Sequence, residues 1–107
     1  MGMKKVKIDL VVTRHPALVE VLQEVPGLDL SEATVLAHAS GADVEGKVVV
    51  GVLPMRLAAL ASRYFELSLD LPAELRGRER SADQGRQYLV GLTEYIVVDR
   101  ARQQLLL

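Results

Sequence analysis

The sequence predicts an α/β domain with a mostly parallel, doubly wound sheet. Segments with strand-like patterns alternate with segments of helical periodicity, an order typical of parallel strands joined by right-handed crossovers. The stretch from Lys47 to Leu53 is apolar on both faces, as expected of a central strand. Two strand-like segments run directly into Pro16 and Pro54, and proline favours the first position of a helix. We therefore expect about four strands with flanking helices.

Length and composition limit the possible classes of protein. The chain has 107 residues, and we expect one domain spanning residues 1–107. It has no cysteine, which excludes disulfides and thiolate metal sites, and no apolar run approaches the roughly 20 residues of a membrane span. We therefore expect a cytoplasmic protein without membrane association. A net charge of −1 argues against nonspecific DNA binding but leaves room for a small anionic ligand in a local basic pocket.

In the first half of the chain, a strand over residues 5–12 precedes a helix that begins at Pro16. The strand alternates polar and apolar side chains until Val11 and Val12. Pro26-Gly27 ends the helix, whose apolar residues at helical spacing are Leu18, Val21, Leu22 and Val25. Residues 34–39 indicate a second strand, although their alanine content also suits a helix.

In the second half, the apolar strand over residues 47–53 precedes a helix over residues 55–63. Residues 64–70 alternate apolar and polar side chains, which predicts a fourth strand at an edge of the sheet. After a polar turn over residues 71–80, Ser81-Ala82-Asp83-Gln84 resembles a capping box. The apolar residues that follow have helical spacing, Tyr88, Leu89, Leu92, Tyr95 and Ile96, so we expect a long C-terminal helix.

The expected strand order is 2-1-3-4, which puts a topological switch point between the first and third strands. Ligands of such sheets bind outside the carboxyl ends of the strands at this point. The segments Thr13-Arg14-His15, Leu53-Pro54 and Ser68-Leu69-Asp70 would then face it. The link between the second and third strands has only about eight residues, which is short for a crossover. An antiparallel second strand is therefore the alternative.

The junction Thr13-Arg14-His15-Pro16 is the leading candidate for a site. It joins a strand to a helix, so its side chains and free backbone N–H groups converge on one point that suits an anion. Arg14 can clamp a phosphate with two hydrogen bonds or form a surface ion pair. His15 can transfer protons near neutral pH or serve as a helix cap or core histidine. These residues alone predict a nucleotide- or phosphate-binding domain.

Further candidate residues lie in and after the fourth strand. Ser68 and Asp70 are two residues apart, so both can reach one pocket and hydrogen-bond ribose or arginine. Asp70 can equally hold Arg76 or Arg78 in place. These two arginines lie with Arg80 in a glycine-containing segment that is either a mobile lid over an anionic ligand or a solvated charged loop.

The remaining polar candidates carry weaker signals. Arg56 lies in the first turn of the second helix, where a bound phosphate would offset its unfavourable interaction with the helix dipole. We expect His38 to be structural. The two histidines have no close partner at metal-ligand spacing, so no metal site is predicted, although Asp9 and Asp70 could bind Mg²⁺ together with substrate phosphates. The tyrosines can stack on bases or belong to the core.

Three segments together resemble the small Csx-sixteen family of CRISPR-associated proteins found beside type III systems. They are Val12-Thr13-Arg14-His15-Pro16, Gly51-Val52-Leu53-Pro54, and the long segment from Leu67 to Glu79. The sequence departs from the family's pattern at Val52 and around His38. The resemblance implies a Rossmann-like domain that recognises cyclic oligoadenylate. It also implies a ring nuclease that cleaves the cyclic tetra-adenylate second messenger and switches off antiviral effectors.

This resemblance leads to a mechanistic hypothesis without metal or cofactor. A ribose 2′-hydroxyl of the bound ring attacks the neighbouring phosphate, which opens the ring and leaves a 2′,3′-cyclic phosphate. The protein would align these groups, neutralise the developing charge and manage protons. We expect catalytic roles for Arg14, His15, Ser68 and Asp70, and ligand-binding roles for Thr13, Arg56, Arg76 and Arg78.

Other expectations concern assembly and alternatives. The ring's approximate two-fold symmetry favours a homodimer, and the apolar residues 96–98 and 105–107 are an independent reason to bury surface against a partner. The first alternative is a non-catalytic module that binds or sequesters the cyclic nucleotide. The second is a small interaction protein that acts through its C-terminal helix.

Overall fold

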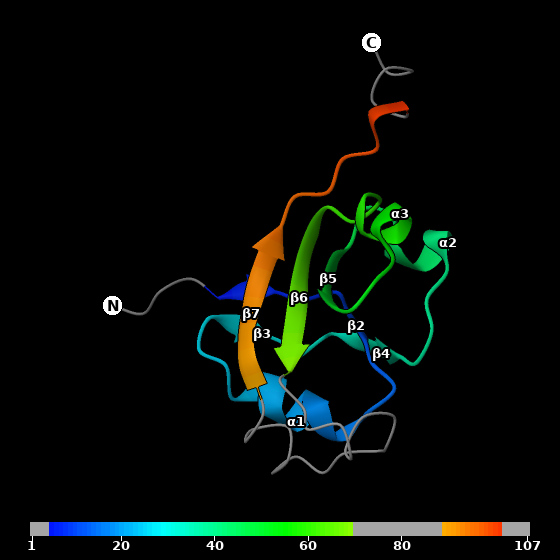
Figure 1. The fold of residues 1–107 in the computed structure, drawn as a ribbon. Helices are drawn as coiled ribbons and strands as arrows, with labels where there is room; N and C mark the ends of the chain where they lie inside the picture. Colours follow the sequence, from blue (N-terminus) through cyan, green and yellow to red (C-terminus); the bar gives the residue numbers. More distant parts are fainter. Residues whose placement is uncertain (1–4, 70–88, 102–107) are drawn as a thin grey trace, which may run out of the picture.

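A computed structural model describes residues 5–69 and 89–101 of the chain, and Figure 1 shows the arrangement of its elements. The strands and helices follow one another in a mixed α/β order, and two of the helices whose bounds are given below are single turns. Their bounds are β1 (Val6–Lys7), β2 (Leu10–Val12), α1 (Ala17–Gln23), β3 (Leu28–Asp29), β4 (Thr34–Leu36), α2 (Gly41–Val44), β5 (Val48–Gly51), α3 (Met55–Ala58), β6 (Arg63–Leu69) and β7 (Leu89–Tyr95).

The main sheet has five strands in the order β4-β2-β5-β6-β7. The pairs β2–β4, β2–β5 and β5–β6 are parallel, whereas β6–β7 is antiparallel. The predicted order 2-1-3-4 is therefore confirmed for the first four strands of this sheet, and the alternative of an antiparallel second strand is wrong. The switch point lies between β2 and β5, as the sequence predicts.

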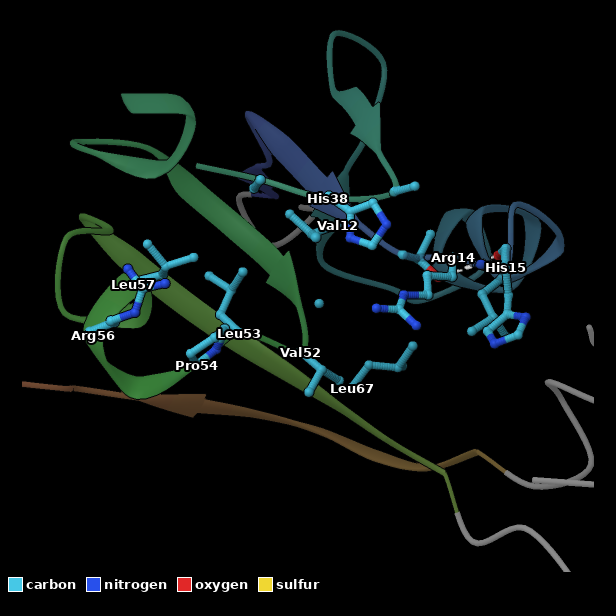
Figure 2. A pocket seen from close by; sticks show the side chains of 15 residues that line it. Val12, Arg14, His15, His38, Val52, Leu53, Pro54, Arg56, Leu57 and Leu67 are labelled. Carbon is cyan, nitrogen blue, oxygen red and sulfur yellow. Dashed lines mark hydrogen bonds between the residues drawn. The ribbon is translucent and has the colours of Figure 1, made fainter. Parts of the chain in front are cut away.

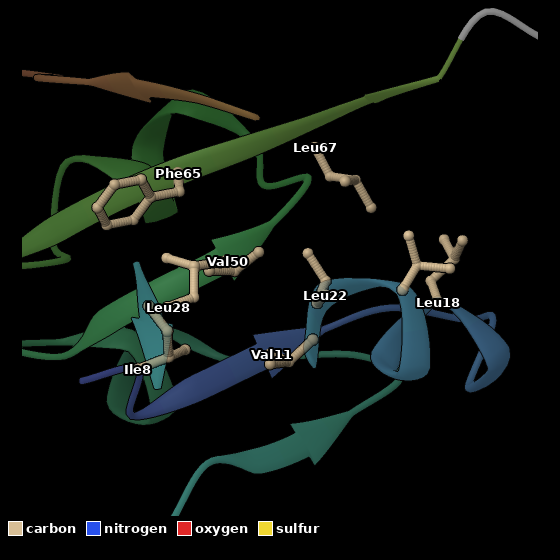
Figure 3. Packing of buried hydrophobic residues seen from close by; sticks show 9 residues of the cluster. Ile8, Val11, Leu18, Leu22, Leu28, Val50, Phe65 and Leu67 are labelled. Carbon is tan, nitrogen blue, oxygen red and sulfur yellow. The ribbon is translucent and has the colours of Figure 1, made fainter. Parts of the chain in front are cut away.

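Two apolar clusters cover the two faces of this sheet, because neighbouring residues of each strand point in opposite directions. Val11, Val50 and Phe65 pack under α1 with other residues of the first cluster (Figure 3). Val12, Val49 and Tyr64 belong to the second cluster, which includes residues of α2 and α3. The apolar character of β5 on both faces, visible in the sequence, follows from its place between the clusters.

The strand predicted over residues 5–12 is divided into β1 and β2 around Asp9. The backbone N–H of Asp9 donates to the carbonyl of Val48, and its carboxylate accepts the Val48 N–H, both at 2.9 Å. Asp9 thereby joins β2 to β5, while β1 pairs instead with β3. The short strand β3 completes this second, two-stranded sheet.

The link between β4 and β5, which is short for a crossover, contains the single-turn helix α2. A capping box begins it: Ser40 accepts the Asp43 N–H, and the Asp43 carboxylate accepts the Ser40 N–H at 2.8 Å. The backbone N–H and the hydroxyl of Ser40 both donate to the Asp43 carboxylate and hold its pKa below its ordinary value. One helical turn is enough to complete this short parallel crossover.

Three predictions for the second half are wrong. The helix expected over residues 55–63 ends at Ala58, and β6 is not an edge strand because β7 pairs with it. Residues 89–95 form this strand and not part of a long C-terminal helix. The guanidinium of Arg63 on β6 donates two hydrogen bonds to the Glu94 carboxylate on β7, at 2.8 and 2.9 Å. The capping box expected at residues 81–84 lies outside the described residues.

The architecture is thus a mixed α/β fold with a mostly parallel sheet. A clear Rossmann arrangement, which the resemblance implies, is not shown, because α2 and α3 are too short to cover the sheet as full crossover helices. Within residues 5–69 and 89–101, no helix has the length and apolar character that a bilayer crossing requires.

Candidate functional site

A cavity of about 700 Å³ opens at the carboxyl edge of the parallel strands. The residues that follow β2, β4 and β5 form its walls, as expected at the switch point of an open α/β sheet. Figure 2 shows them around a shared space. The polar lining residues of the described chain are Thr13, Arg14, His15, His38 and Arg56, and most others are apolar.

The charge of this cavity is entirely basic. Arg14 and Arg56 line it with two histidines, and no aspartate or glutamate is among the lining residues of the described chain. The protein as a whole has 14 acidic residues and a net charge of −1, so the excess of positive charge is a local property of this cavity and not of the whole chain. Such a cavity attracts anions, because no carboxylate among its described lining residues competes with the ligand for the guanidinium groups.

The two arginines approach the cavity from different elements. Arg14 follows β2, whereas Arg56 lies on α3, and both side chains are exposed. Figure 2 shows them on opposite sides, with Leu53 between them. This arrangement suits a ligand with more than one phosphate and an apolar part in the middle.

A short turn shapes the wall that carries Arg14 and His15. The hydroxyl of Thr13 accepts the backbone N–H of His15 at 3.0 Å, which ends the strand and bends the chain toward α1. The carbonyl of His15 then accepts the N–H of Leu18 at 2.9 Å in the first turn of that helix. Thr13 thus positions its two neighbours, and His15 is half-buried at the junction.

Gly51 allows β5 and β2 to approach closely under the cavity. Its φ of +153° is one that side chains with a Cβ rarely adopt. A Cβ at this position would collide with the carbonyl oxygen of Val12. The glycine is therefore required by backbone conformation and by space at the point where the two strands end.

Tyr64 holds the opposite wall, where β5 leads into α3. Its side chain is buried, and its hydroxyl accepts the backbone N–H of Leu53 at 3.0 Å and lies 3.2 Å from the carbonyl oxygen of Gly51. Burial raises the pKa of this hydroxyl because phenolate loses its hydration, while the Leu53 N–H partly opposes the effect. The nearby Glu66 carboxylate adds to the rise. Tyr64 therefore positions the backbone of Gly51 and Leu53 at the cavity wall. From the sequence, the tyrosines could either stack on bases or belong to the core, and Tyr64 belongs to the core.

Replacing Tyr64 by phenylalanine is expected to destabilise the fold by about 1–2 kcal/mol, because the buried Leu53 N–H loses its acceptor. Thermal unfolding at pH 7 would measure this loss. The raised pKa adds a second expectation. Above about pH 10, Tyr64 ionises in the unfolded chain before it ionises in the fold, so the wild type loses stability there. The variant lacks this loss. Tyr95→Phe, at an exposed position, is the matched control, and equal unfolding of both variants would contradict the assigned role.

The structure brings four of the eight predicted site residues to this cavity: Thr13, Arg14, His15 and Arg56. Ser68 is not among the lining residues, because Leu67, its neighbour on the other face of β6, lies there instead. Asp70, Arg76 and Arg78 lie outside the described residues. Their roles, and that of Ser68, stay predictions.

His38 was expected to be structural, yet it is exposed and lines the same cavity. The parallel register of β4 with β2 explains this placement, since Leu36 pairs with Val12 and accepts the N–H of Thr13 at 2.9 Å. His38 therefore follows its strand by as many residues as Arg14 follows β2. The strand predicted over residues 34–39 included His38, whereas β4 ends at Leu36, so the sequence carried no signal that His38 lies beyond the strand end.

The alternative of Mg²⁺ binding by Asp9 and Asp70 gains no support from Asp9, the described residue of this pair. The carboxylate of Asp9 accepts the N–H of Val48, and Asp9 lies at the amino end of β2, whereas the cavity is at the carboxyl end. Residues 5–69 and 89–101 contain no group of three histidine, cysteine, aspartate or glutamate side chains able to hold a metal ion. Asp70 lies outside the described residues.

Fold and site together define an α/β protein with a basic ligand cavity at the switch point of a mostly parallel sheet. The sequence model of the CRISPR-associated protein family Cas_VVA1548 matches residues 10–98, and the chain belongs to this family. The matched segment includes every lining residue of the cavity. Comparisons with curated proteins and with solved structures gave no significant match.

Proposed function

We propose that this CRISPR-associated protein binds cyclic tetra-adenylate in the basic cavity and cleaves it as a ring nuclease, thereby switching off type III antiviral signalling in the cytoplasm. The observation that carries the proposal is a cavity lined by two arginines and two histidines and by no acidic side chain of the described chain. Family membership supports the CRISPR context, and the resemblance to the Csx-sixteen family supports the ligand.

The cavity residues suit cleavage by the ligand's own ribose. The 2′-oxygen attacks phosphorus and the bond from phosphorus to the 5′-oxygen breaks, giving a 2′,3′-cyclic phosphate and a 5′-hydroxyl. Arg14 would hold the phosphate and neutralise the charge of the transition state. His15, at the same wall, is able to move a proton near neutral pH. This chemistry consumes no water and requires no metal.

A homodimer is part of the proposal. Pockets of roughly 300–1,000 Å³ enclose ligands of ordinary drug size, and a ring of four nucleotides is considerably larger. A cavity of about 700 Å³ therefore accommodates a portion of the ring. Val52, which lines the cavity, and Met55, which lies between the lining residues Pro54 and Arg56 in the sequence, are 64% and 80% exposed and provide apolar surface that a second copy would cover.

The test is incubation of the protein with cyclic tetra-adenylate in EDTA. We expect linear products that end in a 2′,3′-cyclic phosphate, detected by mass spectrometry, and binding of one ring per two chains in a calorimetric titration. Cyclic tri- and hexa-adenylate serve as ring-size controls. A bound but intact ring would support the sequestering module instead, and absence of binding would contradict both functions.

A further inference from the structure

The cavity contains a second histidine for which the mechanism above has no role. His38 is exposed, follows β4, and lines the cavity with Arg14 and His15. Its counterpart His15 belongs to a different segment, between β2 and α1. The cavity therefore receives one imidazole from each of two neighbouring strand ends.

The position of Arg14 relates these two rings to a single phosphate. In Figure 2 the Arg14 side chain lies between His38 and His15. In a displacement at phosphorus, the attacking 2′-oxygen and the departing 5′-oxygen lie on opposite sides of the phosphorus atom. A phosphate held by Arg14 would thus present one of these oxygens toward each histidine.

We infer that His38 is the general acid of the proposed ring cleavage, an assignment that rests on the proposed function. Its imidazolium donates a proton to the 5′-oxygen as the bond from phosphorus to that oxygen breaks. His15 accepts the proton of the 2′-hydroxyl as the new bond from the 2′-oxygen to phosphorus forms. One proton is taken up and one released in each turnover, so the exposed ring of His38 is reprotonated from water before the next.

This assignment determines a pH dependence. A general acid must be protonated, so loss of its proton lowers the rate on the alkaline side of the profile, whereas protonation of the base His15 lowers it on the acidic side. The other charged side chains that line the cavity in the described chain are Arg14 and Arg56, which keep their charge throughout this range. His38→Gln is expected to remove the fall of the rate on the alkaline side and to retain the fall on the acidic side.

A ring with sulfur in place of the 5′-oxygens provides the decisive test, because a thiolate leaves without needing a proton. His38→Ala is expected to slow cleavage of the ordinary ring by about 100-fold in single-turnover reactions. Its affinity for that ring should change by less than about threefold. With the sulfur-containing ring, the same variant should approach the wild-type rate, whereas His15→Ala should stay slow with both rings.

The outcomes separate the two proposals. The role of His38 alone would be overturned if the wild type cleaves the ring and His38→Ala cleaves it at the same rate. It would also be overturned if His38→Ala slows cleavage of both rings equally. A wild-type protein that leaves both rings intact would overturn the proposed function and this assignment with it. Circular dichroism and thermal unfolding of His38→Ala and His38→Gln check that the exposed substitution leaves the fold unchanged.

Discussion

Arg14→Ala is expected to reduce cleavage of cyclic tetra-adenylate by about 100- to 1,000-fold and to weaken binding by at least about tenfold. The guanidinium lies in a cavity whose described lining residues include no acidic group, so the ligand's phosphate is its expected counter-ion. Its loss would remove attraction in the bound state and further stabilisation in the transition state. Single-turnover rates and calorimetric titration measure the two effects separately.

Matched variants make this result specific. Arg14→Lys keeps the charge but not the planar pair of donors, so it should recover part of the binding and little of the rate. His15→Ala should slow cleavage more than it weakens binding. Arg100→Ala, at an exposed position beyond β7, removes one positive charge outside the cavity and should change neither quantity. Unchanged binding and cleavage in Arg14→Ala would refute its role as the phosphate clamp.

Gly51→Ala is expected to be the most destabilising of these small substitutions, by about 3 kcal/mol. The new Cβ would meet the carbonyl oxygen of Val12 in a backbone conformation that alanine rarely adopts. Since neither strand end can move without disturbing the pairing of β2 with β5, the clash is not relieved cheaply. A loss of roughly 10–20 °C in the thermal unfolding midpoint corresponds to this free energy in a domain of this size.

Two other glycines separate the causes of this effect. Gly46 also has a positive φ, +73°, but an added Cβ there meets nothing within 4 Å, so Gly46→Ala should show the backbone strain alone, about 1–2 kcal/mol. Gly91, in β7, likewise has open space and no positive φ, and its substitution should be nearly neutral. Equal stability losses at Gly51 and Gly46 would show that contact with Val12 contributes little.

The junction after β2 was predictable because its signals are local. An apolar strand, a threonine whose hydroxyl can bind the next turn, and a proline at the start of a helix occupy consecutive positions. The alternation of strand and helix patterns and the fully apolar β5 predicted a parallel sheet with a central strand, whereas the order of the four strands was assumed and then confirmed by the structure. These features predict that Arg14, His15 and the junction Leu53-Pro54 lie at one edge of the sheet, and all four residues line the cavity there.

The strand β7 was mispredicted because its apolar residues also have helical spacing. Differences in intrinsic helix and strand preference amount to roughly 1 kcal/mol or less per residue. The open edge of β6 outweighs them: it offers a ladder of backbone hydrogen bonds and the contact of Arg63 with Glu94. A local pattern does not reveal that such an edge exists.

Periodicity and composition alone therefore specified a parallel α/β domain and the strand end that carries Arg14. Tertiary structure decided that His38 shares its cavity, that Gly51 must lack a side chain, and that residues 89–95 are extended. Each of these three depends on a segment distant along the chain, namely β2 for His38 and Gly51 and β6 for β7. Pairing between distant strands contributes free energy that exceeds local preference, and only the folded chain brings those strands together.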